Sequence, residues 1–134
     1  MAHIDRAFVG VGLIWLVLGM VLGLFMGITA NNQLLTVHIT MVLSGFVVLA
    51  IYGFIYRLWP VLKESPLAKA QFWVAMIAVL GQVTGAYQFA TSGGTQIAII
   101  AVGSVLAILA GVLMTLMFGM SSAETSRRSE TRAA

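Results

Sequence analysis

The stretch that decides the fold is QLLTVHITMVLSGFVVLAIYGFIYRLW, residues 33–59. It is apolar for long enough to cross the hydrocarbon core of a bilayer, which takes about 20 residues of helix. His38 is the one acidic or basic side chain well inside it. Because such a side chain is costly in lipid and therefore rare there, it indicates a site for a ligand, a proton or a cofactor.

The composition extends this interpretation to the whole chain. Of the 134 residues, 60% are hydrophobic and 8% charged, too few polar side chains for the surface of one soluble domain. We predict an all-α membrane protein, with a four-helix transmembrane domain in residues 1–120. Continuous apolar runs exclude a transmembrane β-barrel, whose strands alternate. The predicted spans are Ala7 to Ile28, Gln33 to Tyr56, Ala70 to Thr91 and Gln96 to Met120.

Basic residues beside the spans predict the orientation. The loop from Arg57 to Lys69 and the tail after Met120 carry most of them, whereas the turns Thr29 to Gln33 and Ser92 to Thr95 carry none. By the positive-inside rule, both termini and the central loop lie in the cytoplasm. Multi-pass insertion in a bacterial inner membrane is the expected location.

The flanks of the spans allow three further expectations. Tyr56, Trp59 and Trp73 are expected at the cytoplasmic interface, as part of an aromatic belt. Residues 121–134 are polar and lack periodicity, so we expect a disordered cytoplasmic tail. The net charge of +3 comes from these flanks and not from a basic stripe interleaved with aromatic residues, which excludes nucleic acid as a partner.

Gly23 and Gly27 of the first span are expected at the depth of His38. Gly19, Gly23 and Gly27 recur at every fourth residue and so share one helical face. A bare face of this kind is typical of close helix packing. The alternative is a smooth wall for a flat macrocycle, and both interpretations remain open here.

His38 itself also has two interpretations. An uninterrupted α-helix places on one face His38, Met41, Val42, Gly45, Leu49, Tyr52 and Tyr56. His38 either serves a functional site there or ties helices together through hydrogen bonds with Thr36, Thr40 or Gln88. We expect no helix breaker and no carboxylate within the spans, which argues against a transporter or proton pump.

Several runs resemble a known family. The run QLLTVHITM at residues 33–41, followed by Gly45-Phe46 and closed by YGFIYRLWP at residues 52–60, resembles the second helix of subunit I of haem-copper oxidases and nitric oxide reductases. The glycines and methionines of the first span are similar to the first helix of that subunit, and QFW at residues 71–73 resembles the start of its third helix. The similarity covers roughly residues 7–90.

The resemblance implies that His38 is an axial ligand to haem iron near the outer face. Because the chain has no cysteine, the haem is expected to be non-covalently held haem b. The implied function is a small membrane haem protein for electron transfer or diatomic gas binding. The alternative is a cofactor-free structural or assembly subunit of a respiratory complex. Other residues expected around the cofactor are Gly19, Gly23, Gly27, Met41, Gly45, Tyr87 and Gln88.

The departures from the family limit the expected chemistry. Family enzymes have about twelve helices, a second ligand to the low-spin haem and three further histidines around a copper. This chain has only His3 and His38, which the predicted topology puts on opposite sides of the membrane. We therefore expect no oxygen-reducing copper centre, and the sequence specifies no substrate.

The histidine count also bears on oligomerisation. Each protomer offers one imidazole at the outer face, so a sixth ligand comes from a neighbouring subunit, Met26, Met41, Tyr87 or Gln88, or the site is open. Subunit I of the oxidases consists of three four-helix arcs, and this chain has the length of one arc. We expect a homotrimer, with a dimer sharing one haem as the alternative, in contact with lipid and with a possible redox partner.

Overall fold

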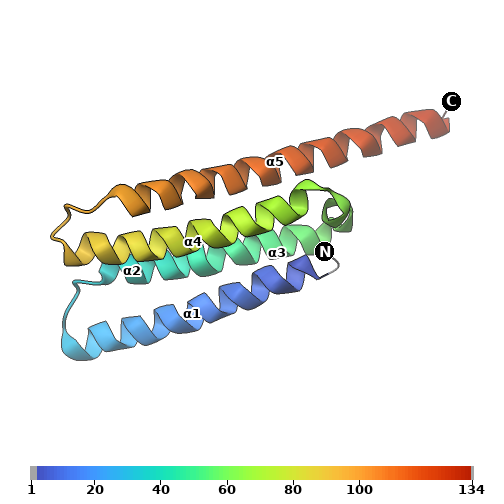
Figure 1. The fold of residues 1–134 in the computed structure, drawn as a ribbon. Coiled ribbons are helices and arrows are strands. Elements are labelled where there is room, and N and C mark those ends of the chain that lie inside the picture. The colour runs from blue at the N-terminus through green and yellow to red at the C-terminus, as the bar shows by residue number, and fades with distance from the viewer. Residues whose placement is uncertain (1–2, 134) are drawn as a thin grey trace.

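The computed structural model describes the backbone of residues 3–133 and the side chains of residues 3–121. Its described part is all-helical (Figure 1). The helices are α1 (Ile4–Thr29), α2 (Leu35–Thr40), the π-helix η1 (Met41–Val48), α3 (Leu49–Leu58), the 3₁₀-helix η2 (Pro60–Glu64), α4 (Leu67–Thr91) and α5 (Ala98–Ala133).

Four helical segments are long and apolar enough to cross a membrane, because α2, η1 and α3 follow one another without a break. The four predicted spans are thereby confirmed. The disorder predicted for residues 121–134 stays a prediction, since the side chains after Ser121 lie outside the described part. The spans are Ile4–Thr29, Leu35–Leu58, Leu67–Thr91 and Ala98–Ser121.

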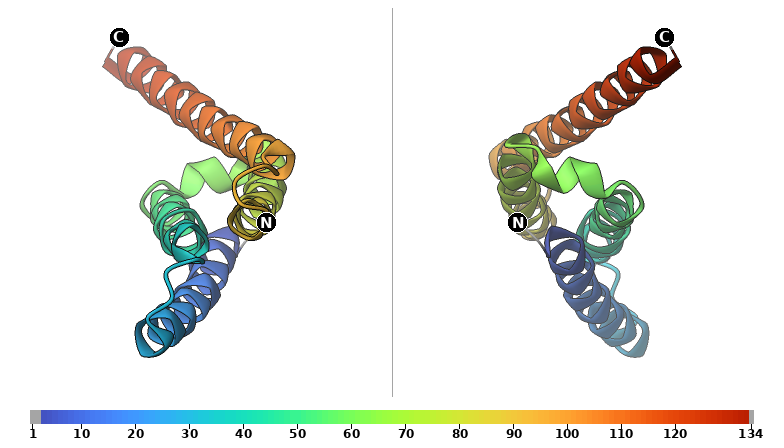
Figure 2. Two further views of the ribbon diagram at one scale, coloured as in Figure 1. Left: turned by 90° about the vertical axis from the view of Figure 1, so that its left-hand side faces the viewer. Right: turned by 90° about the vertical axis from the view of Figure 1, so that its right-hand side faces the viewer.

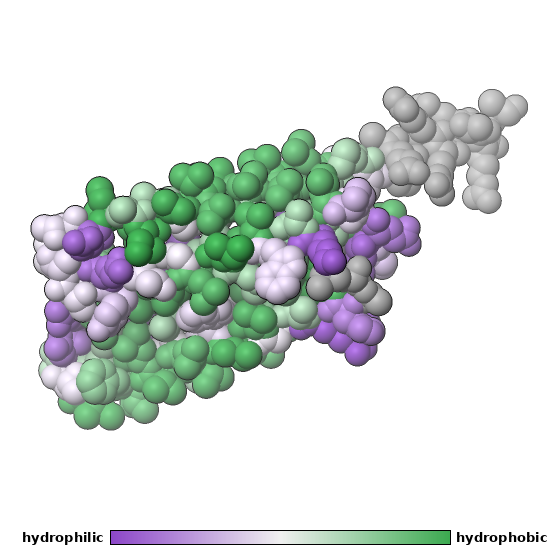
Figure 3. All heavy atoms as spheres, viewed as in Figure 1, coloured by the Kyte–Doolittle hydropathy of each residue, from purple (hydrophilic) through white to green (hydrophobic). Residues whose placement is uncertain are grey.

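The helices form an open arrangement. The α1–α2 and α4–α5 turns share one end of the molecule, while the N-terminus and η2 share the other (Figure 1). α1 packs mainly against α2, η1 and α3, and α5 packs mainly against α4. These two outer helices lie on opposite sides of the central pair (Figure 2). The visible flank between the two polar ends is largely apolar, which suits contact with lipid (Figure 3).

The best-buried side chains lie toward the end that carries η2. The ring of Phe8 stacks on that of Tyr56, with centroids 5.8 Å apart, and meets the ring of Phe72 edge-on. Tyr56 is fully buried, and its hydroxyl donates to Oε1 of Gln71 at 3.2 Å. The expectation that Tyr56 belongs to an interfacial belt was therefore wrong, because this phenol finds its partner inside the protein. Trp59, by contrast, is exposed.

The second span changes its winding shortly after His38. Residues Met41–Val48 form a π-helix, so the expected uninterrupted α-helix was wrong. Val42 and Gly45 meet α1. Tyr52 lies between α1 and α5, because its ring meets that of Phe8 edge-on and its hydroxyl lies near Gly111.

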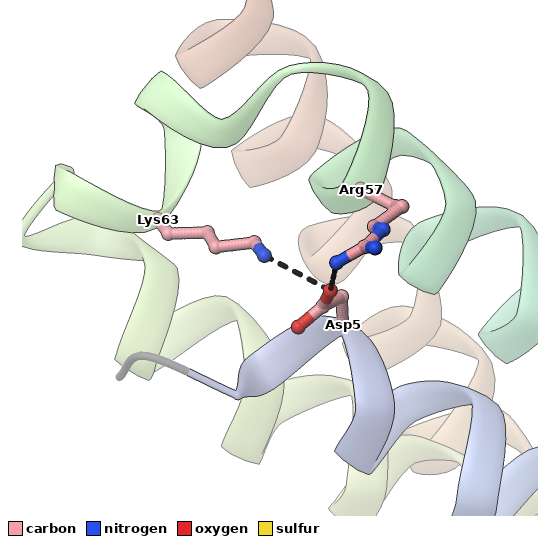
Figure 4. A network of polar contacts seen from close by, with 3 residues as sticks. All are labelled: Asp5, Arg57 and Lys63. Carbon is pink, nitrogen blue, oxygen red and sulfur yellow. Dashed lines mark ion pairs between the residues drawn. The ribbon is translucent and has the colours of Figure 1, made fainter.

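The carboxylate Asp5 lies in the first turn of α1, ahead of the predicted start of the span. The structure begins this helix at Ile4, one turn before the predicted start at Ala7, and so includes Asp5. Asp5 is 7% exposed in its side chain and contacts Lys63 at 2.9 Å and Arg57 at 3.6 Å (Figure 4). The ion pairs offset the cost of burying its charge.

Candidate functional site

The imidazole of His38 faces α1. His38 is half-buried in α2, and its Nδ1 lies 2.8 Å from the carbonyl oxygen of Gly19. A backbone carbonyl oxygen only accepts hydrogen bonds, so Nδ1 carries the proton. In a neutral imidazole with that tautomer, Nε2 has the free lone pair that binds a metal ion.

Gly23 makes room for the same ring. A Cβ atom at this position would lie 2.9 Å from Cε1 of His38 and 3.2 Å from its Nδ1. Real Cβ atoms essentially never come that close, so any larger residue would push the imidazole away from α1. Gly19 supplies the hydrogen-bond acceptor and Gly23, one turn later, supplies the space.

The other predicted glycines have different surroundings. A Cβ at Gly19 would meet Cγ2 of Val42 at 3.0 Å, and one at Gly45 would meet Cγ of Trp15 at 2.7 Å. Gly27 has no such neighbour within 4 Å among the described atoms. Gly19, Gly23 and Gly45 thus mediate contact between α1 and the second span. A macrocycle wall remains a prediction, and Gly27 is the position that contact with α2 leaves open.

Other predicted cofactor residues are not joined to His38 by any hydrogen bond seen in residues 3–121. Met41 is half-buried beside the core, and Met26 is buried. Tyr87 is exposed and Gln88 half-buried, both on α4. The structure thus brings His38 together with Gly19 and Gly23. A role in cofactor binding for the other candidate residues stays a prediction.

The hydrogen-bond partners that the sequence suggested for His38 are not the ones that the structure shows. The hydroxyl of Thr40 donates to the carbonyl oxygen of Thr36 at 2.8 Å, within the helix. The partner of His38 is instead a backbone carbonyl in another helix. The signal available in the sequence was the spacing of Gly19 and Gly23, because small residues on one face allow a neighbouring helix to come within reach of the backbone.

Comparison with known proteins gives a family match for almost the whole chain. Residues 3–133 match the family model of cytochrome c and quinol oxidase polypeptide I. The chain belongs to this family. No curated protein and no solved structure matches it.

Membership in the oxidase polypeptide I family agrees with the resemblance seen around His38 and extends it through the last span. The chain is an integral membrane protein like haem-copper oxidase subunit I, with four helices suited to crossing a bilayer. Proteins of this family bind haem. A haem site at His38 requires a ring nitrogen that is free to bind iron.

The donor chemistry at His38 fits a haem. Ligating histidines usually donate their second ring nitrogen to a carbonyl or carboxylate, which fixes the tautomer and the ring orientation. The Nδ1 contact with Gly19 has this form. Nε2 of the half-buried ring makes no hydrogen bond that is seen in the described residues, and it remains the nitrogen suited to iron.

Proposed function

We propose that this protein is a membrane-embedded b-type haem protein in which Nε2 of His38 is an axial ligand to the iron. Its role is electron transfer or the binding of a diatomic gas at the membrane face formed by the α1–α2 end. The observation that carries the proposal is the 2.8 Å contact between Nδ1 of His38 and the Gly19 carbonyl oxygen. Family membership supports the choice of haem over other cofactors.

The chain's own residues have three tasks in this proposal. The Gly19 carbonyl holds the proton on Nδ1 and so keeps the lone pair on Nε2. Gly23 lets the ring lie against α1, which restricts its orientation. Surrounding apolar side chains keep the local dielectric low, which influences reduction potential. When bound, haem supplies the one-electron and gas-binding chemistry.

A homotrimer is the assembly that we propose. Two features of α1 leave room for a neighbouring subunit in place of lipid: α1 packs mainly on one neighbouring span, and its exposed side chains include Met20, Leu24 and Ile28. These three recur at every fourth residue, so they form one apolar stripe. A trimer would close the open arrangement into a ring, and its three His38 residues supply three five-coordinate sites.

An absorption spectrum of the purified full chain tests the proposal. After haem-replete expression, we expect a Soret band in the wild type, its loss in His38→Ala, and its retention in the matched control His3→Ala. His3 is exposed at the opposite end of α1. A colourless wild type with native helix content, or a Soret band that survives in His38→Ala, contradicts the proposal.

Carbon monoxide and mass then address the coordination. If the iron has an open face, carbon monoxide shifts the Soret band of the reduced protein, whereas a neighbouring subunit's imidazole on that face prevents the shift. The mass in detergent, combined with haem per chain, separates a trimer with one haem per chain from a dimer that shares one. A monomeric mass removes the trimer from the proposal and leaves the haem ligand to the spectrum.

A structural or assembly subunit is the second candidate function, and the same contact favours it. The His38–Gly19 bond joins two transmembrane helices without any cofactor. If this is the whole role, the wild type is colourless, and His38→Ala lowers the thermal stability of the apoprotein. Such hydrogen bonds between membrane helices average about 0.6 kcal/mol, with a maximum near 1.7.

A further inference from the structure

A groove runs along the junction of α1 and α3, at the end of the molecule opposite His38. It has a volume of about 360 Å³. Its apolar part is lined by Val9, Gly10 and Leu13 of α1 and by Phe54 of α3. Leu13 and Phe54 are exposed large apolar side chains. Because both belong to predicted membrane spans, this part of the groove opens toward the acyl chains of lipid.

The rest of the lining is charged and carries more basic than acidic side chains. Arg6 and Arg57 line the groove together with Asp5. Asp5 already has a close partner, since Lys63 lies 2.9 Å from its carboxylate and only 16% of the Lys63 side chain is exposed. Arg57 contacts the same carboxylate at 3.6 Å but is 69% exposed. Lys63 therefore neutralises Asp5, and two guanidinium groups remain for an external anion.

We propose that this groove binds an anionic phospholipid. Its phosphate lies between the Arg6 and Arg57 guanidiniums, and one acyl chain follows the apolar part along α1. Guanidinium groups match the oxygens of a phosphate with two parallel hydrogen bonds. Basic pockets between membrane helices suit anionic headgroups for the same reason. A free anion would use the two arginines only, and the apolar wall selects for the lipid.

Gly10 makes the apolar part accessible. A Cβ built on this residue meets no atom within 4 Å, so the space above it is open. The side chain of a leucine at position 10 would begin in that open space, and the change leaves every charge in place. Arg6 is likewise exposed. These two positions therefore change the groove without removing a packed side chain.

Native mass spectrometry of the delipidated full chain tests the proposal. Dioleoylphosphatidylglycerol and dioleoylphosphatidylcholine are titrated separately, and the bound fraction gives the affinity of each. We expect the anionic lipid to bind at least fivefold more tightly to the wild type. Arg6→Gln should weaken its binding about fivefold, since one basic residue near a charged lipid surface contributes about that factor. Gly10→Leu should weaken it by a similar factor with the charge unchanged.

Two control variants and one competitor make the outcome decisive. Lys69→Gln removes one charge from an exposed residue at the same end, outside the groove lining. Gly119→Leu adds the same side chain at another open position. Both should bind the anionic lipid as the wild type does. The proposal is overturned if Lys69→Gln weakens binding as much as Arg6→Gln, if Gly10→Leu binds normally, or if inorganic phosphate displaces the lipid.

Discussion

Nδ1 of His38 and the carbonyl oxygen of Gly19 form a 2.8 Å hydrogen bond that joins the second membrane span to the first. The acceptor is backbone, so no side-chain replacement at Gly19 removes it directly. The Gly19 carbonyl oxygen lies within hydrogen-bond distance of His38 because α2 approaches α1 closely, and this approach depends on the absence of a side chain at Gly23. The proposed metal ligand is thus positioned by a residue without a side chain.

Gly23→Ala should therefore impair haem binding. The new methyl group would begin 2.9 Å from Cε1 of His38, and the imidazole must turn or α1 must move away. Either change lengthens the bond to the Gly19 carbonyl and lowers haem per chain, because removing the partner that orients a ligand typically costs 10- to 100-fold in affinity. Haem titration of the apoprotein, followed by the Soret band, measures the effect.

Two other glycines complete this experiment. Gly119→Ala adds a methyl group in open space on α5 and serves as the matched control. Gly27→Ala separates the two interpretations of the stripe on α1. Haem loss there supports a macrocycle wall, whereas normal haem binding supports helix packing. If Gly23→Ala takes up haem as well as Gly119→Ala does, the Gly19–His38 bond has no role in ligation.

The sequence predicted the spans and His38 because both depend on the cost of polar groups in lipid. The lengths of the apolar runs determine how many helices cross the membrane. A single imidazole within such a run is easily recognised as a candidate site, because ionisable side chains are rare there. The partner of His38 had a weaker signal, the spacing of Gly19 and Gly23, since every residue carries a carbonyl and only the close approach of the helices distinguishes that of Gly19. The π turns of Met41–Val48 likewise have no counterpart in the spacing of the apolar residues, which predicted a continuous α-helix.

The start of α1 also depends on a contact that the local sequence does not reveal. Hydropathy placed the first residue of the span at Ala7, because Asp5 and Arg6 are charged. The structure extends the helix to Ile4 since Lys63, distant in sequence, pairs with Asp5. A hydropathy scale that considers only neighbouring residues leaves Asp5 out of the helix. The structure includes it because a basic residue distant in sequence pairs with its charge.

Asp5→Asn should destabilise the protein through Lys63 more than through Arg57. Asp5 and Lys63 are both largely buried and 2.9 Å apart, and removing one member of a buried pair costs about 3–5 kcal/mol. The exposed Arg57, at 3.6 Å, should contribute at most about 1 kcal/mol. Thermal unfolding in detergent without anionic lipid measures Asp5→Asn, Lys63→Gln, Arg57→Gln and the double variants. Additive losses for Asp5→Asn and Lys63→Gln would show that the two residues are not coupled.

Gly45→Ala should destabilise the contact between η1 and α1. Its Cβ would lie 2.7 Å from Cγ of Trp15 and 2.8 Å from Cβ of Trp15, and overpacking of this kind costs about 1–3 kcal/mol. Trp15→Ala in the same chain removes the clash, so the double variant should lose less than the sum of the two single losses. Melting temperatures of the four proteins give this coupling. A Gly45→Ala protein as stable as the wild type would mean that α1 and η1 are further apart than described.

Tyr56→Phe should cost about 1–3 kcal/mol, although the change removes a single oxygen atom. The Tyr56 hydroxyl donates to Oε1 of Gln71, and Nε2 of Gln71 is buried without a hydrogen-bond partner in the described part of the chain. Without the hydroxyl, Oε1 also loses its partner, and an unsatisfied buried acceptor retains its full desolvation cost. Replacing the amide as well, in Tyr56→Phe/Gln71→Leu, removes the stranded polar group and should recover most of the loss. The recovery is measured by unfolding the two single variants and the double variant in the same detergent. A double variant that is less stable than Tyr56→Phe would show that Gln71 has another partner.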